Sequence, residues 1–281
     1  MEQVLDVASV RRRALLGYLG AAAAAALTGC GATVGSGAEQ VVEAEPLSTS
    51  PTSATSPTPT PVPTAVPAPT PTKRIFVPDY VLPPIVNGLA PVISRIPTAH
   101  PIVFLTIDDG LTRTPEMVRL MRAYNYPASL FLTQSTVSAD PAFFTQFAAQ
   151  GSLVENHTVN HNINMIRTMG YQQQLAEISG MQDFATTQYG RTPTLFRPPG
   201  GAYSGAMQQA VAAAGLRAII TWEAKANAGR MDYQVGNALR PGDIVLMHFR
   251  PEFAADLEAF RAAQLAAGLE VVLLEEFLGV V

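Results

Sequence analysis

Apolar and β-branched residues gather in short runs along the last two thirds of the chain, and helical patterns separate most of these runs. Seven runs predict strands, at residues 102–107, 129–133, 152–156, 194–196, 216–222, 243–247 and 270–274. Thr114 followed by Pro115 predicts a helix start, and Gly151, Gly215 and Gly268 predict helix ends. Alternating strands and helices predict a parallel sheet, and about seven such units in one domain favour a barrel over an open sheet.

The first third of the chain lacks this alternation and has the composition of an export and linker region. Residues 9–30 join a basic start to an alanine-rich apolar run and end in LTGC, which resembles a bacterial lipobox. Arg12-Arg13 resembles the twin-arginine export pattern. A membrane-spanning helix is the alternative, but the run is short for crossing a bilayer. We expect an export and lipoprotein signal over residues 1–30 and a disordered Pro/Thr/Ser-rich stalk over residues 31–74.

The number of cysteines and the net charge exclude several kinds of site and partner. Cys30 is the only cysteine, which excludes a disulfide framework and a thiolate metal site and leaves lipidation as its expected use. The net charge is −4 and the segment from residue 101 onward has no basic block, so nucleic acid is not an expected partner. We expect a monomeric catalytic domain over residues 75–281, held outside the cytoplasm by a lipid anchor in the cell membrane.

The first predicted strand ends in two adjacent aspartates, Asp108 and Asp109. Neighbouring side chains of a strand point to opposite faces, so the two carboxylates cannot share one task while the strand continues. Gly110 permits a sharp turn that places both carboxylates at the strand's C-terminal edge. An acidic turn without further function is the alternative.

His157 and His161 follow the third predicted strand at a spacing of four residues. On a helical turn both imidazoles would reach one metal ion. Two histidines and one carboxylate form an open ligand set, for which zinc is the first candidate, with cobalt or another divalent metal as alternatives. If Asp109 completes this set, Asp108 is left free as a candidate general base.

Three further residues fall at the same expected edge. His248 ends the apolar strand of residues 243–247 and is a candidate proton donor. Arg197 places a positive charge on the rim, before a turn whose glycine N–H could approach an oxyanion; a salt bridge that holds the loop is the alternative. Trp222 is expected either to wall a small apolar pocket or to belong to the core.

Four motifs in this order resemble those of the polysaccharide deacetylase family, the carbohydrate esterases that share the NodB homology domain. TIDDG, HTVNH, RPPG and LMH are similar to the family's T-F-D-D-G, H-T-x-x-H, R-P-P-[YF]-G and L-x-H. The resemblance covers residues 102–274. It implies a distorted (β/α)7-type barrel with the active site at the C-terminal ends of the strands.

The resemblance also implies a role for each matching residue. The implied roles are Asp108 as general base, His248 as general acid, Arg197 as the residue that orients the base, Asp109, His157 and His161 as metal ligands, Gly200 as an oxyanion donor, and Leu246 as lining of the acetyl pocket.

The chain departs from the family pattern at three places. Leu111 stands where proline is usual, and Gly200 stands where an aromatic is usual, so one wall of the substrate groove is expected to be missing. After Trp222 the family carries an aspartate that tunes the acid histidine, whereas Lys225 lies near that place here. Glu223 and Asp232 are the candidate substitutes.

Together these observations predict a metal-dependent hydrolase that removes acetyl groups from an N-acetylated or O-acetylated polysaccharide of a cell wall or the environment. Two alternatives stay open. One is a surface lipoprotein that binds glycan without catalysis. The other is a deacetylase of a small acetylated amine or amide.

Overall fold

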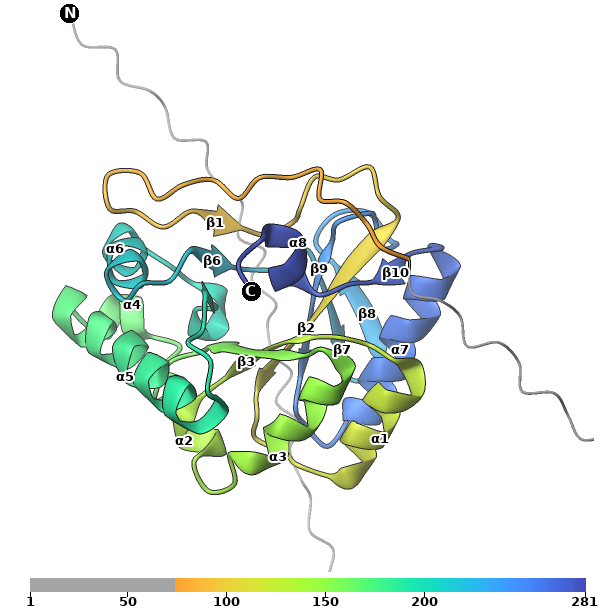
Figure 1. Ribbon diagram of the computed structural model, residues 1–281, viewed down its shortest axis with the longest axis horizontal. Coiled ribbons are helices and arrows are strands. Elements are labelled where there is room, and N and C mark those ends of the chain that lie inside the picture. Colours follow the sequence, from red (N-terminus) through yellow and green to blue (C-terminus); the bar gives the residue numbers. More distant parts are fainter. Residues whose placement is uncertain (1–73) are drawn as a thin grey trace, which may run out of the picture. The chain divides into compact units, whose positions relative to one another are not determined.

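The computed structural model describes residues 74–281, which fold as one α/β unit (Figure 1). The expected signal over residues 1–30, Cys30 and nearly all of the stalk over residues 31–74 lie outside the described residues. Within residues 74–281, no helix is both long enough and apolar enough to span a bilayer.

Ten strands form the sheet. They are β1 (Val92–Ile93), β2 (Ile102–Asp109), β3 (Ser129–Leu132), β4 (Leu153–Asn156), β5 (Leu195–Phe196), β6 (Ala218–Ile220), β7 (Ala224–Asn227), β8 (Arg230–Tyr233), β9 (Ile244–His248) and β10 (Glu270–Val271). Each of the seven predicted strand runs overlaps one of these strands, and β2 and β9 continue past the predicted ends, to Asp109 and His248. The strands β1, β7 and β8 were not predicted, because β1 is very short and because AKAN and RMDY are too polar to form an apolar run.

Eight α-helices and two 3-10 helices connect the strands. They are α1 (Pro115–Tyr124), α2 (Gln134–Val137), α3 (Ala142–Thr145), η1 (Gln146–Gln150), α4 (Met165–Thr168), α5 (Tyr171–Tyr189), η2 (Pro199–Gly201), α6 (Gly205–Ala213), α7 (Phe253–Ala266) and α8 (Leu274–Leu278). Thr114 and Pro115 begin α1 as predicted. Gly151, Gly215 and Gly268 all have the left-handed backbone expected of residues that follow a helix.

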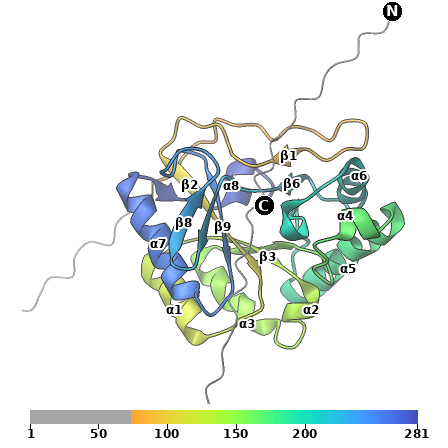
Figure 2. The ribbon, with the colours of Figure 1, turned by 180° about the vertical axis from the view of Figure 1, so that it is seen from behind.

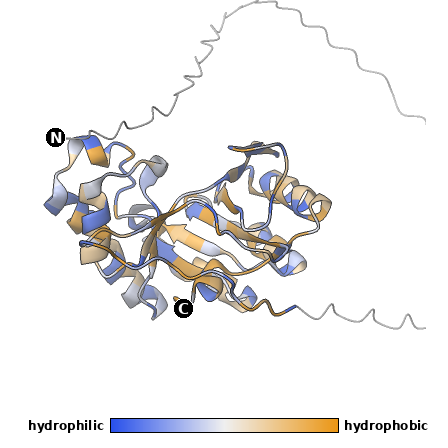
Figure 3. Cartoon of the chain, turned by 90° about the horizontal axis from the view of Figure 1, so that it is seen from above, coloured by the Kyte–Doolittle hydropathy of each residue, from blue (hydrophilic) through white to orange (hydrophobic). Residues whose placement is uncertain are grey.

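The strands pair in the order β1-β6-β5-β4-β3-β2-β9-β7-β8, and β10 pairs with the start of β2. All pairs are parallel except the β7–β8 hairpin. The sheet curls into a distorted barrel with helices outside it, and apolar residues concentrate on its central strands (Figures 2 and 3). Within residues 74–281 no pairing joins β1 to β8, so the barrel is open on that side.

Helix α8 covers the end of the barrel where the strands begin. It lies in the middle of the view in Figure 1, with Leu274 and Phe277 in the same apolar cluster as Phe104 and Phe131. Its Glu275 is fully buried and accepts a hydrogen bond from Ser129 Oγ at 2.8 Å, at the first residue of β3. This helix therefore seals the end opposite to the one where the strands finish.

Burial, reinforced by the nearby Glu155 carboxylate, raises the pKa of Glu275 well above its usual value. When the pH exceeds the ordinary pKa of a glutamate, the unfolded chain ionises this group while the folded chain keeps the proton. The free energy of unfolding therefore falls, by about 1.4 kcal/mol per pH unit, until the folded-state pKa is reached.

We expect Glu275→Gln to remove this loss, because the amide has the shape of the protonated acid and does not titrate. Thermal unfolding should give the variant and the wild type similar melting temperatures near pH 4 and a variant that melts several degrees higher at pH 7.5. Glu276→Gln, at the exposed neighbouring position, should show no such divergence. If the melting temperatures of Glu275→Gln and the wild type differ by the same amount at every pH, the pKa of Glu275 is not raised in the folded protein.

Candidate active site and metal site

The predicted sharp turn at Gly110 is present, and it brings both aspartates to the C-terminal end of β2. Asp108 is 3% exposed, whereas Asp109 and Gly110 both have a left-handed backbone, with φ of 73° and 81°. A Cβ at residue 110 would lie 2.4 Å from Val137 Cγ1, so this turn has room only for glycine. The turn, rather than strand alternation, therefore sets the directions of the two carboxylates.

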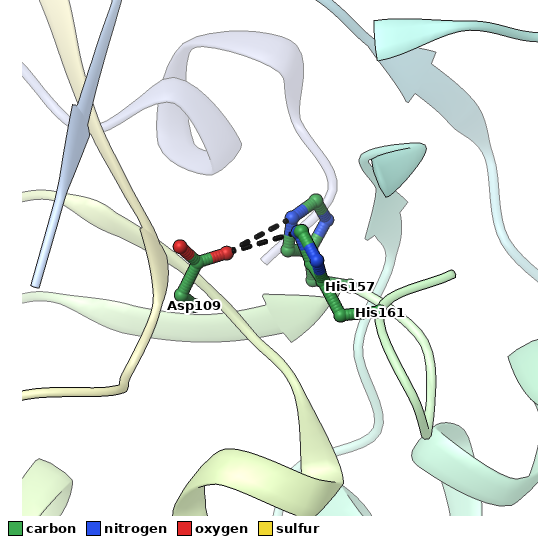
Figure 4. Close-up of side chains that lie close together, drawn as sticks. All are labelled: Asp109, His157 and His161. Carbon is green, nitrogen blue, oxygen red and sulfur yellow. Dashed lines mark ion pairs between the residues drawn. The ribbon is translucent and has the colours of Figure 1, made fainter. Parts of the chain in front are cut away.

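Asp109 points at the two histidines of the second motif (Figure 4). Its Oδ1 lies 3.1 Å from His161 Nε2 and 3.5 Å from His157 Nε2. One ligand atom from each of the three residues lies within 4.8 Å of the others. The three residues therefore form one compact set of nitrogen and oxygen atoms, as the sequence predicted.

The two histidines do not lie on a helical turn, so that expectation was wrong. The segment is a loop in which Thr158 and His161 have left-handed backbone, with φ of 72° and 53°. Asn156 Oδ1 accepts a hydrogen bond from Thr158 N, and Thr158 Oγ1 accepts one from His161 N. These local side-chain bonds replace helical ones, and the loop brings the imidazoles together with ring centroids 4.9 Å apart.

This set fits a divalent metal ion. Asp109 Oδ1 is buried and has no hydrogen-bond partner among the described residues, which is costly unless a cation completes the site. His157 Nδ1 lies 2.7 Å from the carbonyl oxygen of Arg197, which directs Nε2 toward Asp109. Burial opposes ionisation of Asp109, but the two imidazoles outweigh it and lower the pKa of this carboxyl well below its usual range.

Arg197 lies beneath the rim rather than on it and is fully buried. Its Nη1 donates hydrogen bonds of 2.7 Å to Asp108 Oδ1 and to Thr106 Oγ1, and its Nε and Nη2 donate to the backbone carbonyls of Ile220 and Thr221. The guanidinium carbon lies 4.3 Å from the centroid of the Phe131 ring. The arginine therefore fixes the Asp108 carboxylate and does not simply brace a surface loop.

His248 ends β9, and its Cα pairs with that of Asp108 on β2. Burial lowers the pKa of His248, and the carboxylates of Asp108 and Asp109 only partly offset this. Within residues 74–281, no carboxylate forms an ion pair with His248. The two candidate substitutes are engaged elsewhere: Glu223 pairs with Arg240, and Asp232 pairs with Lys225 and Arg230.

These residues open into one pocket of about 310 Å³. The pocket contains the predicted site residues Asp108, Asp109, His157, His161, Gly200, Trp222, Leu246 and His248, together with Ile163, Lys225, Asn227 and Arg250. Arg197 is absent from the lining because it lies below. The fourth histidine, His100, lies elsewhere, with Nε2 2.7 Å from the carbonyl oxygen of Val77.

Three features of the pocket wall were not predicted. Ile163 lies beside Gly200, 3.4 Å from where a Cβ at that position would be, so it occupies the wall expected to be missing. A Cβ at Gly201 would lie 2.7 Å from the Trp222 indole, which shows that the glycine permits the tryptophan's place on the pocket. Arg250 in the pocket lining was not predicted either, because it lies in a bend after β9 that the sequence does not indicate.

The model of the family described as polysaccharide deacetylase matches residues 95–219. A peptidoglycan-N-acetylglucosamine deacetylase of Bacillus cereus is 30% identical over 166 residues, which cover 55% of this chain and 75% of the relative. The chain belongs to the polysaccharide deacetylase family. An uncharacterized protein of Streptomyces coelicolor is 37% identical over 189 residues, covering 66% of this chain and 71% of the relative.

Solved structures agree with this placement. A family 4 carbohydrate esterase from Streptomyces lividans in complex with acetate superposes with a TM-score of 0.51 at 27% identity, covering 63% of this chain and 93% of that one. The predicted fold class, a distorted (β/α)7 barrel, is confirmed. The site lies at the C-terminal ends of its strands.

We expect His161→Ala to lower the affinity for zinc by more than about 100-fold, because it removes one of the three candidate ligands that lie together in the described residues. Metal content per chain after dialysis, and the rise in melting temperature on adding zinc, would measure this. His100→Ala is the matched control, since it removes a histidine outside the pocket and should leave both readouts unchanged. Equal zinc content in the two variants would contradict the ligand set.

Proposed function

We propose that this protein is a metal-dependent hydrolase that removes acetyl groups from an acetylated polysaccharide, with an N-acetylated cell-wall glycan as the first candidate. The observation that supports this best is the convergence of three elements in one pocket. They are the set formed by Asp109 and the two histidines, a buried carboxylate held by an arginine, and a histidine on the adjoining strand. A protein that only binds glycan would not require all three of these elements.

Asp109, His157 and His161 would hold the ion, and zinc, cobalt or another divalent metal suits these ligands. The chemistry that such an ion supplies when bound is Lewis-acid polarisation of the acetyl carbonyl and of the attacking water. His157 is further oriented by the backbone carbonyl of Arg197, which keeps its Nε2 directed into the site.

Asp108 is the proposed general base, which would take a proton from the attacking water. Its Oδ1 is occupied by Arg197 at 2.7 Å, whereas Oδ2 lies 3.6 Å from His157 Nε2, on the side of the metal ligands. The arginine therefore fixes the carboxylate and leaves its second oxygen for the water. The N–H of Gly200 would help to stabilise the oxyanion.

His248 is the proposed general acid, which would protonate the departing amine or alkoxide. No carboxylate pairs with its ring among residues 74–281, so Asp108 and Asp109 act on it only through space. Leu246 and Trp222 line the same pocket and would contact the acetyl group. The Trp222 indole packs directly against Gly201, and this contact fixes the position of the indole in the pocket wall.

We further propose that the domain acts outside the cytoplasm. The support is in the sequence: a basic and apolar N-terminal segment ends in LTGC, and a Pro/Thr/Ser-rich stretch follows it. Lipidation of Cys30 would tether the domain to the cell membrane, and the stalk would hold it away from the surface.

Acetate release tests the function. Purified protein loaded with zinc or cobalt should release acetate from N-acetylglucosamine oligomers, peptidoglycan or acetylated xylan. A chelator should abolish the release, and returning the metal should restore it. Failure to release acetate from all three substrates would overturn the proposal.

Asp108→Asn should lower kcat by about 10²–10⁴-fold, because it removes the general base. It should still bind zinc, because Asp108 is not one of the three ligands, whereas Asp109→Asn should lose both zinc and activity. Since Asp108→Asn leaves Arg197 without its counter-charge, circular dichroism must show that the variant is folded. Full activity in folded Asp108→Asn would exclude Asp108 as the base.

A further inference from the structure

The C-terminal ends of β7 and β9 carry three polar side chains that the proposed chemistry does not use. Lys225 and Asn227 alternate with the buried Ala224 and Ala226 on β7, so both face the pocket. Arg250 lies in the bend that follows β9 and also lines the pocket. We call Lys225, Asn227 and Arg250 the polar lip.

Arg250 is held in place by its neighbour. Phe249 is fully buried and packs against Phe144, with ring centroids 5.3 Å apart, and against Phe253, with ring centroids 5.6 Å apart. The backbone N–H of Phe249 also donates to the carbonyl of Asp108. Phe249 is thus anchored in the core, and the chain bends directly after β9, where the backbone N–H of Arg250 donates to the carbonyl of His248. This bend places Arg250 in the lining of the pocket.

The charge of Arg250 has no carboxylate partner among residues 74–281. Its recorded side-chain hydrogen bond runs from Nη1 to the amide oxygen of Asn227, at 3.2 Å. The two carboxylates inside the pocket are engaged elsewhere, since Asp108 pairs with Arg197 and Asp109 faces the two histidines. Arg250 therefore presents an uncompensated guanidinium to the space that the substrate would enter.

Lys225 adds to this positive charge. Its Nζ lies 3.5 Å from Asp232 Oδ2, but Arg230 lies 3.7 Å from the other oxygen of the same carboxylate. One acidic side chain thus faces two cations, and the lip keeps an excess of positive charge. The pocket lining also includes the apolar side chains of Ile163 and Trp222, so polar and apolar contacts are both available to a bound sugar.

We propose that the polar lip is a carboxylate-binding subsite, and that the preferred substrate is an acetylated sugar chain with a carboxylate close to the acetyl group that is removed. This rests on the proposed deacetylase function. The guanidinium of Arg250 would bind the carboxylate with two parallel N–H donors, Asn227 orients that guanidinium, and Lys225 contributes charge. Sugars that bear a lactyl ether and uronic acids both supply such a group.

Binding and turnover should be measured on three oligosaccharides of equal length. One contains only N-acetylglucosamine, one alternates it with N-acetylmuramic acid, and one is an acetylated glucuronoxylan fragment. The wild type should bind at least one of the two carboxylated oligosaccharides about tenfold more tightly than the neutral one. Preference for the oligosaccharide with N-acetylmuramic acid would identify the lactyl ether as the recognised group, and preference for the glucuronoxylan fragment would identify the uronic acid. Amidation of that carboxylate should abolish the preference.

Arg250→Gln should abolish the difference in KM between the carboxylated and the neutral oligosaccharide, so that the variant binds the two about equally. Arg250→Lys should retain part of the preference, because lysine keeps the positive charge but lacks the two parallel N–H donors of the guanidinium. Arg122→Gln, at an exposed position of α1, is the control and should behave as the wild type.

Equilibrium binding separates this proposal from the proposed function. If the carboxylate preference is present in binding but no acetate is released, the subsite stands and the deacetylase function fails. If acetate is released but neither carboxylated oligosaccharide is preferred, or if folded Arg250→Gln keeps the full preference, the subsite proposal is overturned.

Discussion

The buried pair of Arg197 and Asp108 is the interaction on which the arrangement of the site depends. Placing two charges inside a barrel costs several kcal/mol for each ion unless every polar atom finds a partner. Here Arg197 donates to Asp108, Thr106 and two backbone carbonyls and packs against the Phe131 ring. Strands β2, β3, β5 and β6 must therefore meet around one guanidinium group. The same residue orients His157 through its carbonyl oxygen, so the base and a proposed metal ligand share one support.

The sequence predicted the parts of the fold that depend on burial. Continuous apolar runs mark strands that are covered on both faces, and all seven were found where they were expected. Hairpin β7–β8 was missed because one of its faces is polar, and sequence alone does not distinguish such a segment from a loop. The positions of Asp109, His157 and His161 at strand ends were also predictable, since the ends of parallel strands meet at one edge.

The details of the site depend on contacts between distant segments, which the sequence does not reveal. The histidine loop follows from bonds made by Asn156 and Thr158, and these replace the helical turn that the spacing suggested. Arg197 is fully buried because its partners lie on three other segments, which are β2, β3 and the end of β6. Ile163 occupies space beside Gly200 from 37 positions away along the chain, so the missing aromatic does not leave a gap. A departure from a motif is therefore weak evidence of lost function until the surrounding walls are known.

Helix α8 connects the far end of the barrel to the chemistry. Leu274 and Phe277 pack in one apolar cluster with Phe131, and Phe131 in turn lies under the Arg197 guanidinium. A volume change at α8 can thus reach the residue that holds Asp108, although α8 contributes nothing to the pocket lining. Directed evolution for heat resistance would meet a trade-off there. Substitutions that tighten the floor of the barrel would also move the carboxylate above it, and so change the rate.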